Sequence, residues 1–147
     1  PQKCCPLFLQ WLRLFGEFLS FPFCQVAAKS VLNTSVVADS SKAVKTLGTK
    51  FPLPVEIIGE AFVPVKKALE ALGAKVVLRE GVKKCGPVIT DNGNQIVDCL
   101  WSSPVDSKKM EDIINDITGV VEVGFFTKNK PIAFIAKEDG TVEVRGL

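Results

Sequence analysis

Histidine and tyrosine are absent from the 147 residues, and methionine occurs once, at Met110. Without histidine the chain has no Ser-His-Asp or Cys-His nucleophile pair, no imidazole metal ligand and no imidazole acid–base catalyst. Any acid–base chemistry is therefore left to groups such as carboxylates and lysines.

A marked excess of one charge sign is also missing. Lys plus Arg number 18 against 16 for Asp plus Glu, so the formal net charge is +2. A nucleic-acid or anionic-membrane partner would call for a strongly basic stripe, so we expect neither. The chain is 47% hydrophobic and 23% charged. That composition and length suit one typical domain or two small ones with a sizeable core.

The five cysteines show no metal-binding spacing. Cys4 and Cys5 are adjacent, Cys24 stands alone, and Cys85 and Cys99 are far apart, so no Cys-x-x-Cys pair exists. The odd count argues against a secreted disulfide framework and favours reduced thiols that act as small apolar side chains. Gly-rich phosphate-binding motifs are likewise missing from the sequence.

Residues 1–25 form an atypical hydrophobic leader. Five of the ten phenylalanines lie there, and Gln10, Arg13 and Glu17 interrupt its apolar run. The run is shorter than the roughly 18–20 apolar residues of a membrane-spanning helix. Three interpretations stay open: a non-native leader, a packing helix or a membrane contact. Since the chain begins at Pro1, we expect a fragment or a processed product.

From residue 26 onward helical and strand patterns alternate. We expect the end of a helix at 26–32 and two full helices at 61–72 and 107–117. We expect strands at 35–38, from 55 onward, and at 75–80, 120–126, 131–136 and 141–144. A hairpin is expected at 86–101. Pro52 and Pro54 cannot belong to a central strand, so the second strand should begin near Val55.

Both helices have clear end signals. In the first, Val65, Ala68, Leu69 and Leu72 share one face, Pro64 suits the first turn, and Gly73 suits the C-terminal cap. The second should be capped by Asp106 and ended by Gly119. Its apolar face should consist of Met110, Ile113, Ile114 and Ile117.

Asn92-Gly93 is typical of a type I′ hairpin turn. A calcium loop would need further carboxylates after Asp91, and Gln95-Ile96-Val97 follow instead. Residues 53–126 thus predict a β-α-β-β-α-β order, the ferredoxin-like arrangement of two helices on an antiparallel sheet. Residues 26–50 and 130–147 should form parts of a second, parallel layer.

Lys42 is the polar residue that position alone singles out. It follows a strand expected to be buried in a parallel sheet, and ligands bind outside the carboxyl ends of such strands. A lysine there can serve as a point charge for a sugar hydroxyl or phosphate. The alternative is an ordinary surface lysine.

Four segments together resemble the C-terminal half of the type A ribose-5-phosphate isomerases. They are residues 37–42 (VADSSK), 47–56 (LGTKFPLPVE), 86–94 (GPVITDNGN) and 117–126 (ITGVVEVGFF). The similarity covers about residues 26–147, in order and without large gaps.

The resemblance implies an α/β fold: a partial Rossmann-like parallel-sheet core at 26–50 and 128–147, carrying a ferredoxin-like α+β lid domain at 51–127. It also implies a cytoplasmic, homo-oligomeric enzyme that interconverts ribose 5-phosphate and ribulose 5-phosphate through an enediolate. Neither cofactor nor metal is implied, and the expected partner is the sugar phosphate. Lys42 is the substrate-binding residue that the resemblance retains.

The family's other functional segments do not occur in the sequence. These are its phosphate loop, Asp-Gly-Ala-Asp-Glu, Lys-Gly-Gly-Gly and Arg-Glu-Lys. The catalytic glutamate would fall near Cys24, where there is no carboxylate, so no catalytic residue is assigned. We therefore expect this chain to be inactive alone. The alternative is a non-catalytic ferredoxin-like module that self-associates or binds a partner.

Overall fold

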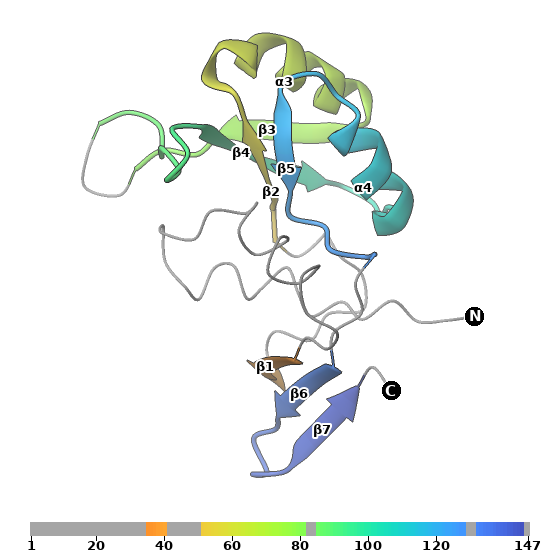
Figure 1. Ribbon diagram of the computed structural model, residues 1–147. Coiled ribbons are helices and arrows are strands. Elements are labelled where there is room, and N and C mark those ends of the chain that lie inside the picture. The colour runs from red at the N-terminus through yellow and green to blue at the C-terminus, as the bar shows by residue number, and fades with distance from the viewer. Residues whose placement is uncertain (1–34, 41–50, 82–84, 129–131, 146–147) are drawn as a thin grey trace.

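The computed structural model describes residues 35–40, 51–81, 85–128 and 132–145. Within them the chain forms a three-stranded sheet and a four-stranded sheet (Figure 1). In order along the chain, the elements are β1 (Ser35–Asp39), β2 (Leu53–Ile57), η3 (Gly59–Ala61), α3 (Phe62–Ala71), β3 (Ala74–Leu78), β4 (Gln95–Trp101), α4 (Ser107–Asn115), β5 (Val120–Val123), β6 (Ile132–Ala136) and β7 (Val142–Arg145).

The smaller sheet has the strand order β1-β6-β7. β1 runs parallel to β6, which confirms the expected parallel strand at 35–38, and β7 returns antiparallel to β6. Burial on both faces was also expected of β1, and this is wrong. Ala38 is buried, whereas the Val37 side chain, which points to the other face, is 65% exposed.

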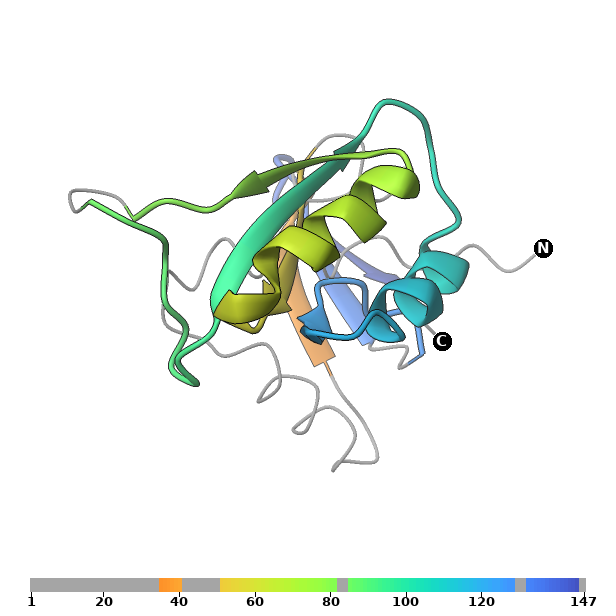
Figure 2. The same ribbon diagram turned by 90° about the horizontal axis from the view of Figure 1, so that it is seen from above.

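The larger sheet has the order β3-β4-β2-β5, and all of its neighbouring strands are antiparallel. Its elements follow one another as β-α-β-β-α-β, as the sequence predicts. Both helices, α3 and α4, cover the same face of this sheet (Figures 1 and 2). On the opposite face, Val88 and Ile96 form a smaller apolar cluster with Phe126, and Ile96 pairs in register with the buried Glu56.

The structure corrects the predicted start of β2. The strand begins at Leu53, and Pro54 lies inside it, between β4 and β5. The N–H and C=O of one strand residue point the same way, and the Pro54 carbonyl accepts a hydrogen bond from Gly124 N at 2.9 Å. The side of Pro54 that lacks an N–H therefore faces Gly124, just beyond β5. The hydrogen bonds between β2 and β4 are not interrupted.

The first helix agrees with its sequence signals. Val65 and Leu69 are fully buried, and Leu72 packs against the core. Gly73 follows with a φ of 81°, the left-handed conformation expected of the residue after the C-cap.

The second helix departs from the prediction on one face. Asp106 caps it, accepting hydrogen bonds from the backbone N–H groups of Lys108 and Lys109. Ile114 is buried, but Ile113, expected beside it, is 45% exposed. Glu111 is buried instead, because it bonds to the chain beyond β5.

The hairpin before β4 has a three-residue loop, which corrects the predicted type I′ turn. Gly93 N donates to Thr90 O, and Thr90 N donates to Asn94 O. Asp91 and Asn92 therefore occupy the centre of the turn, and Gly93 follows with a φ of 80°. This pattern is that of a three-residue hairpin loop whose last residue is left-handed.

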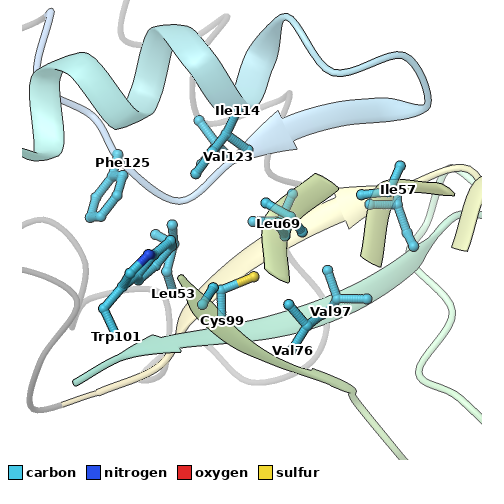
Figure 3. Packing of buried hydrophobic residues seen from close by; sticks show 13 residues of the cluster. Leu53, Ile57, Leu69, Val76, Val97, Cys99, Trp101, Ile114, Val123 and Phe125 are labelled. Carbon is cyan, nitrogen blue, oxygen red and sulfur yellow. The ribbon is translucent and has the colours of Figure 1, made fainter. Parts of the chain in front are cut away.

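The main hydrophobic core lies between the four-stranded sheet and its two helices. Figure 3 shows Phe125 and Trp101 close together and Leu69 above the strands. The ring centroids of Trp101 and Phe125 are 6.3 Å apart, and Trp101 Nε1 donates to Leu72 O at 3.0 Å. The core thus joins helix α3, strand β4 and the segment after β5.

Some predictions fall outside the described residues. These are the leader at 1–25, the helix end at 26–32 and the candidate substrate-binding residue Lys42. Among the described helices, none has the length and apolarity needed to cross a membrane.

Candidate functional site

The carboxyl end of β1 is the place where the sequence predicts ligand binding. Asp39 ends the strand and pairs in register with Ala136 of β6, and Ser40 follows it. The two parallel strands therefore end side by side, as they do at ligand sites of open α/β sheets. Lys42 comes two positions after Ser40, and its geometry lies outside the described residues.

A second polar cluster is buried in the larger sheet and surrounds Glu56 of β2. Glu56 is fully buried, and its Oε1 accepts hydrogen bonds from Thr90 Oγ1 and Asn94 Nδ2, each at 2.9 Å. The other oxygen, Oε2, is buried without a hydrogen-bond partner. One carboxylate oxygen thus ties the hairpin to the central strand.

The hairpin is built to present both donors. Asn94 N donates to Thr90 Oγ1 at 3.1 Å, so the hydroxyl that bonds Glu56 is itself held by the loop. Glu122 of β5 lies opposite Glu56 in the strand register, which places two carboxylates on neighbouring strands and on one face.

Sequence reasoning missed this cluster. The segment containing Thr90 and Asn94 was predicted to form a turn and resembles a segment of the isomerase family, but no contact with Glu56 was predicted for it. The available signal was the carboxylate of Glu56 between apolar residues of the LPVEII run, because a buried charge needs hydrogen-bond donors.

A second buried carboxylate holds the chain where it leaves the larger sheet. Glu111 of α4 is 2% exposed, and its Oε2 accepts hydrogen bonds from Thr127 N at 2.7 Å and from Thr127 Oγ1. The next residue, Lys128, forms an ion pair with Asp112 at 2.7 Å. Its pKa is raised, chiefly by the hydrogen bond to that carboxylate. Both contacts fix the start of the connection to β6.

The other polar groups of this sheet are structural in character. Arg79, the residue that follows β3, makes two hydrogen bonds to Asp98 of β4. Burial, with a smaller contribution from Asp98, raises the pKa of the Cys99 thiol to about 12, so this cysteine is no nucleophile near neutral pH. Cys85 is exposed, and both cysteines are free thiols.

The described residues contain no group of three or more acidic, cysteine or histidine side chains that could hold a metal ion. Their carboxylates at Glu56 and Glu111 are each committed to holding a loop. The described residues therefore offer the carboxyl end of β1 and two loops that are each held by a buried carboxylate. Lys42, Glu56 and Glu111 lie in three separate segments, and no described contact brings them together.

Comparison with known proteins identifies the architecture. The family model of ribose 5-phosphate isomerase A (phosphoriboisomerase A) matches residues 25–140. The chain belongs to the ribose 5-phosphate isomerase A family. The resemblance carried by the four sequence segments is thereby confirmed. The match begins at the compositional break that separates the leader from the rest of the chain.

Curated proteins named ribose-5-phosphate isomerase A are similar to this chain in sequence, in agreement with the family match. The ribose-5-phosphate isomerase A of Treponema denticola is 57% identical over 110 residues, which are 74% of this chain and 46% of that protein. The protein of Methanocaldococcus jannaschii is 52% identical over 93 residues, 63% of this chain and 41% of that protein. The chain therefore spans about half the length of the curated relatives it matches.

Solved structures of ribose 5-phosphate isomerases have the same fold over the matched part. The Methanocaldococcus jannaschii structure has a TM-score of 0.79 at 39% identity and covers 86% of this chain and 55% of that one. A structure of a D-ribose-5-phosphate isomerase in complex with phospho-erythronic acid has a TM-score of 0.80 at 34% identity, with the same coverage. The mixed α/β fold of the described residues is thus the fold of this family.

Proposed function

We propose that the protein to which this chain belongs interconverts ribose 5-phosphate and ribulose 5-phosphate. The observation that carries the proposal is the match of residues 25–140 to the ribose 5-phosphate isomerase A family. The fold of the described residues, with its TM-score of 0.79 at 39% identity to an isomerase of that name, supports it. A phosphorylated sugar acid bound to another isomerase belongs to the same chemical class as the proposed substrate.

The proposed architecture has two parts. Residues 26–50 and 128–147 belong to a Rossmann-like core, and residues 51–127 form a ferredoxin-like lid. The parallel pairing of β1 with β6 supports the first assignment. The order β3-β4-β2-β5 with both helices on one face supports the second. The lid and the core are then joined at Phe51 and at Lys128.

The proposed chemistry is a proton transfer between two neighbouring carbons. A carboxylate base removes the proton from C2 of the aldose and an enediolate forms. The proton of the C2 hydroxyl passes to the C1 oxygen, and the base returns its proton to C1 to give the ketose. The developing negative charge on oxygen needs cationic or N–H donors. Lys42, beyond the carboxyl end of β1, is the residue of this chain that we propose for binding the sugar phosphate.

The catalytic base is proposed to come from a segment that this sequence does not contain, since the Arg-Glu-Lys motif is absent from it. The chain by itself is therefore expected to be inactive. For the whole protein we propose a cytoplasmic location and a homo-oligomeric state, as the family resemblance implies.

A chimera tests the proposed function. Residues 26–147 replace the aligned part of the Treponema denticola protein, whose identity over 110 residues is 57%. We expect the chimera to isomerise ribose 5-phosphate and Lys42→Ala to reduce kcat/KM by at least about a hundredfold, because a charge-assisted contact is lost. Lys109→Ala, an exposed position on α4, is the matched control.

Three outcomes oppose the proposal. A folded chimera without isomerase activity would contradict the function, and equal effects of Lys42→Ala and Lys109→Ala would contradict the role of Lys42. Isomerisation by residues 1–147 alone would contradict the proposed inactivity of the chain.

A further inference from the structure

Two consecutive residues of α4 hold two consecutive residues that follow β5. Glu111 Oε2 accepts hydrogen bonds from Thr127 N at 2.7 Å and from Thr127 Oγ1. The neighbouring carboxylate oxygen, Asp112 Oδ1, lies 2.7 Å from Lys128 Nζ. We call these four residues the exit clasp, because the chain passes them on its way from the four-stranded sheet to β6 (Figure 1).

The two halves of the exit clasp differ in strength. The Glu111 side chain is buried, and hydrogen bonds to a buried carboxylate are strong because an unpaired charge is costly there. Asp112 and Lys128 are 55% and 53% exposed, and an ion pair at such positions contributes little. Glu111 therefore carries most of the clasp.

The carboxylate of Glu111 is not needed for the packing of α4. Ile114 is the fully buried apolar residue of this helix. An apolar side chain at position 111 could also be buried, without the cost of removing a charge from water. What the carboxylate adds is a fixed position for the chain that leaves the four-stranded sheet.

The exit clasp lies at the boundary between the two sheets. The main core ends at Phe125, and β6 begins at Ile132. The extensive contacts between described elements lie within one sheet or within the unit formed by the four-stranded sheet and its helices. Along its described elements the chain crosses between the sheets twice, from β1 to β2 and from β5 to β6. The orientation of one sheet relative to the other therefore depends on how these crossings are held, since changes at element ends can rotate whole domains.

We propose that Glu111 is a positioning residue of the isomerase. By holding Thr127, it fixes the lid at 51–127 relative to β6 and thus to β1, whose carboxyl end precedes Lys42. In this role Glu111 acts through the path of the chain and not through contact with the substrate. The proposal rests on the proposed function, because a misplacement of about 1 Å in an active site can lower the rate about a hundredfold.

The distance between two spin labels tests the orientation directly. The labels are attached at Lys75→Cys on β3 and Val142→Cys on β7, two exposed positions. They are placed in residues 1–147 after every cysteine except the buried Cys99 has been replaced by serine. We expect a narrow distance distribution, and one at least about twofold wider with Glu111→Leu, which removes the acceptor but keeps an apolar side chain of similar size.

Two variants of Thr127 separate the hydrogen bond from the fold. Thr127→Val keeps the shape but loses the hydroxyl, so it should broaden the distribution less than Glu111→Leu, since the backbone N–H still donates. Thr127→Ser keeps the hydroxyl and should preserve the narrow distribution. Lys109→Leu, at an exposed position of the same helix, is the matched control for Glu111→Leu and should change nothing. Circular dichroism shows whether each variant is folded, and if Glu111→Leu does not fold, the difference between Thr127→Val and Thr127→Ser decides.

The chimera with the Treponema denticola protein gives the catalytic measurement. Glu111→Leu should lower its kcat/KM at least about tenfold, whereas Lys109→Leu should not. A broad distribution in the wild-type chain would overturn the proposal, as would no broadening with Glu111→Leu or equal broadening with Lys109→Leu. Broadening without loss of activity in the chimera would overturn the positioning role. Distances that depend on Glu111, together with an inactive wild-type chimera, would support the fixed orientation and contradict only the proposed function.

Discussion

Gly124 lies where a side chain would not fit. A Cβ atom there would be 3.0 Å from the carbonyl oxygen and from Cγ of Pro54, and neither the strand nor the ring can move away easily. Gly124→Ala should therefore lower the free energy of unfolding by about 1–3 kcal/mol, the usual cost of overpacking. Chemical denaturation measures it. Gly59→Ala is the control, since its Cβ would meet only the mobile end of Gln95 at 3.2 Å. Equal losses of unfolding free energy in the two variants would contradict the expected steric conflict with Pro54.

Glu56 is expected to stabilise the hairpin through hydrogen bonds more than through its charge. Glu56→Ala removes the acceptor of both Thr90 and Asn94 and should cost about 2–4 kcal/mol of unfolding free energy. Glu56→Gln keeps one carbonyl oxygen for the two donors and should cost about 1 kcal/mol or less. Urea titration of both variants measures these losses of unfolding free energy. If glutamine costs as much as alanine, the negative charge itself is required.

The two described cysteines should differ in reactivity. Cys99 has a pKa of about 12, so burial keeps it in the thiol form at pH 8, whereas Cys85 is exposed. Iodoacetamide should therefore label Cys85 and spare Cys99 in the folded chain, with peptide mass spectrometry as the readout. Because the pKa of Cys99 is raised on folding, its contribution to stability is complete below about pH 9 and declines as pH rises toward 12. Rapid labelling of Cys99 at pH 8 before unfolding would disprove its burial.

At the scale of elements, the start of α4 depends on one side chain. Asp106 accepts hydrogen bonds from Lys108 N and Lys109 N at 3.1 and 3.3 Å. Asp106→Ala should lower the unfolding free energy by about 1 kcal/mol, measured by thermal denaturation. Asp116→Ala is the control at the opposite end of the helix, where a negative charge is unfavourable, and it should be neutral or slightly stabilising. A loss at position 116 equal to that at 106 would argue against capping.

The elements themselves could be predicted because their signals are local. Periodicity located both helices, and the Asn92-Gly93 pair located the hairpin. Tertiary contacts decided two features that local signals do not contain. Pro54 is tolerated in a central strand because the side of the residue that lacks an N–H faces Gly124, just beyond β5. The buried face of α4 includes Glu111, which bonds Thr127, whereas Ile113 is exposed. The role of Glu56 as an anchor was missed for the same reason, since Thr90 and Asn94 are distant in sequence. Lys42 stays a prediction.

On the scale of the whole molecule, the two sheets should differ in stability. The main cluster of 13 buried residues lies entirely between Leu53 and Phe125. In the smaller sheet, the buried apolar residues are Ala38, Ala133 and Ile135, counting only described positions. Amide hydrogen exchange followed by mass spectrometry should therefore show slow exchange in β2 and β4 and much faster exchange in β7. Uniform protection of both sheets would indicate that they unfold together.

The position of β2 has a consequence for how the polypeptide acquires its structure during synthesis. This strand leaves the ribosome first among the four of its sheet, yet Val55 pairs with Val97 and Val123, both much later in the chain. Its two neighbours are joined to it by long-range contacts that delay assembly. Until residue 123 has been synthesised, the apolar side chains of β2 lack the partners that β5 supplies. We therefore expect this unit to fold late during synthesis, and the apolar side chains of β2 to be open to self-association until then.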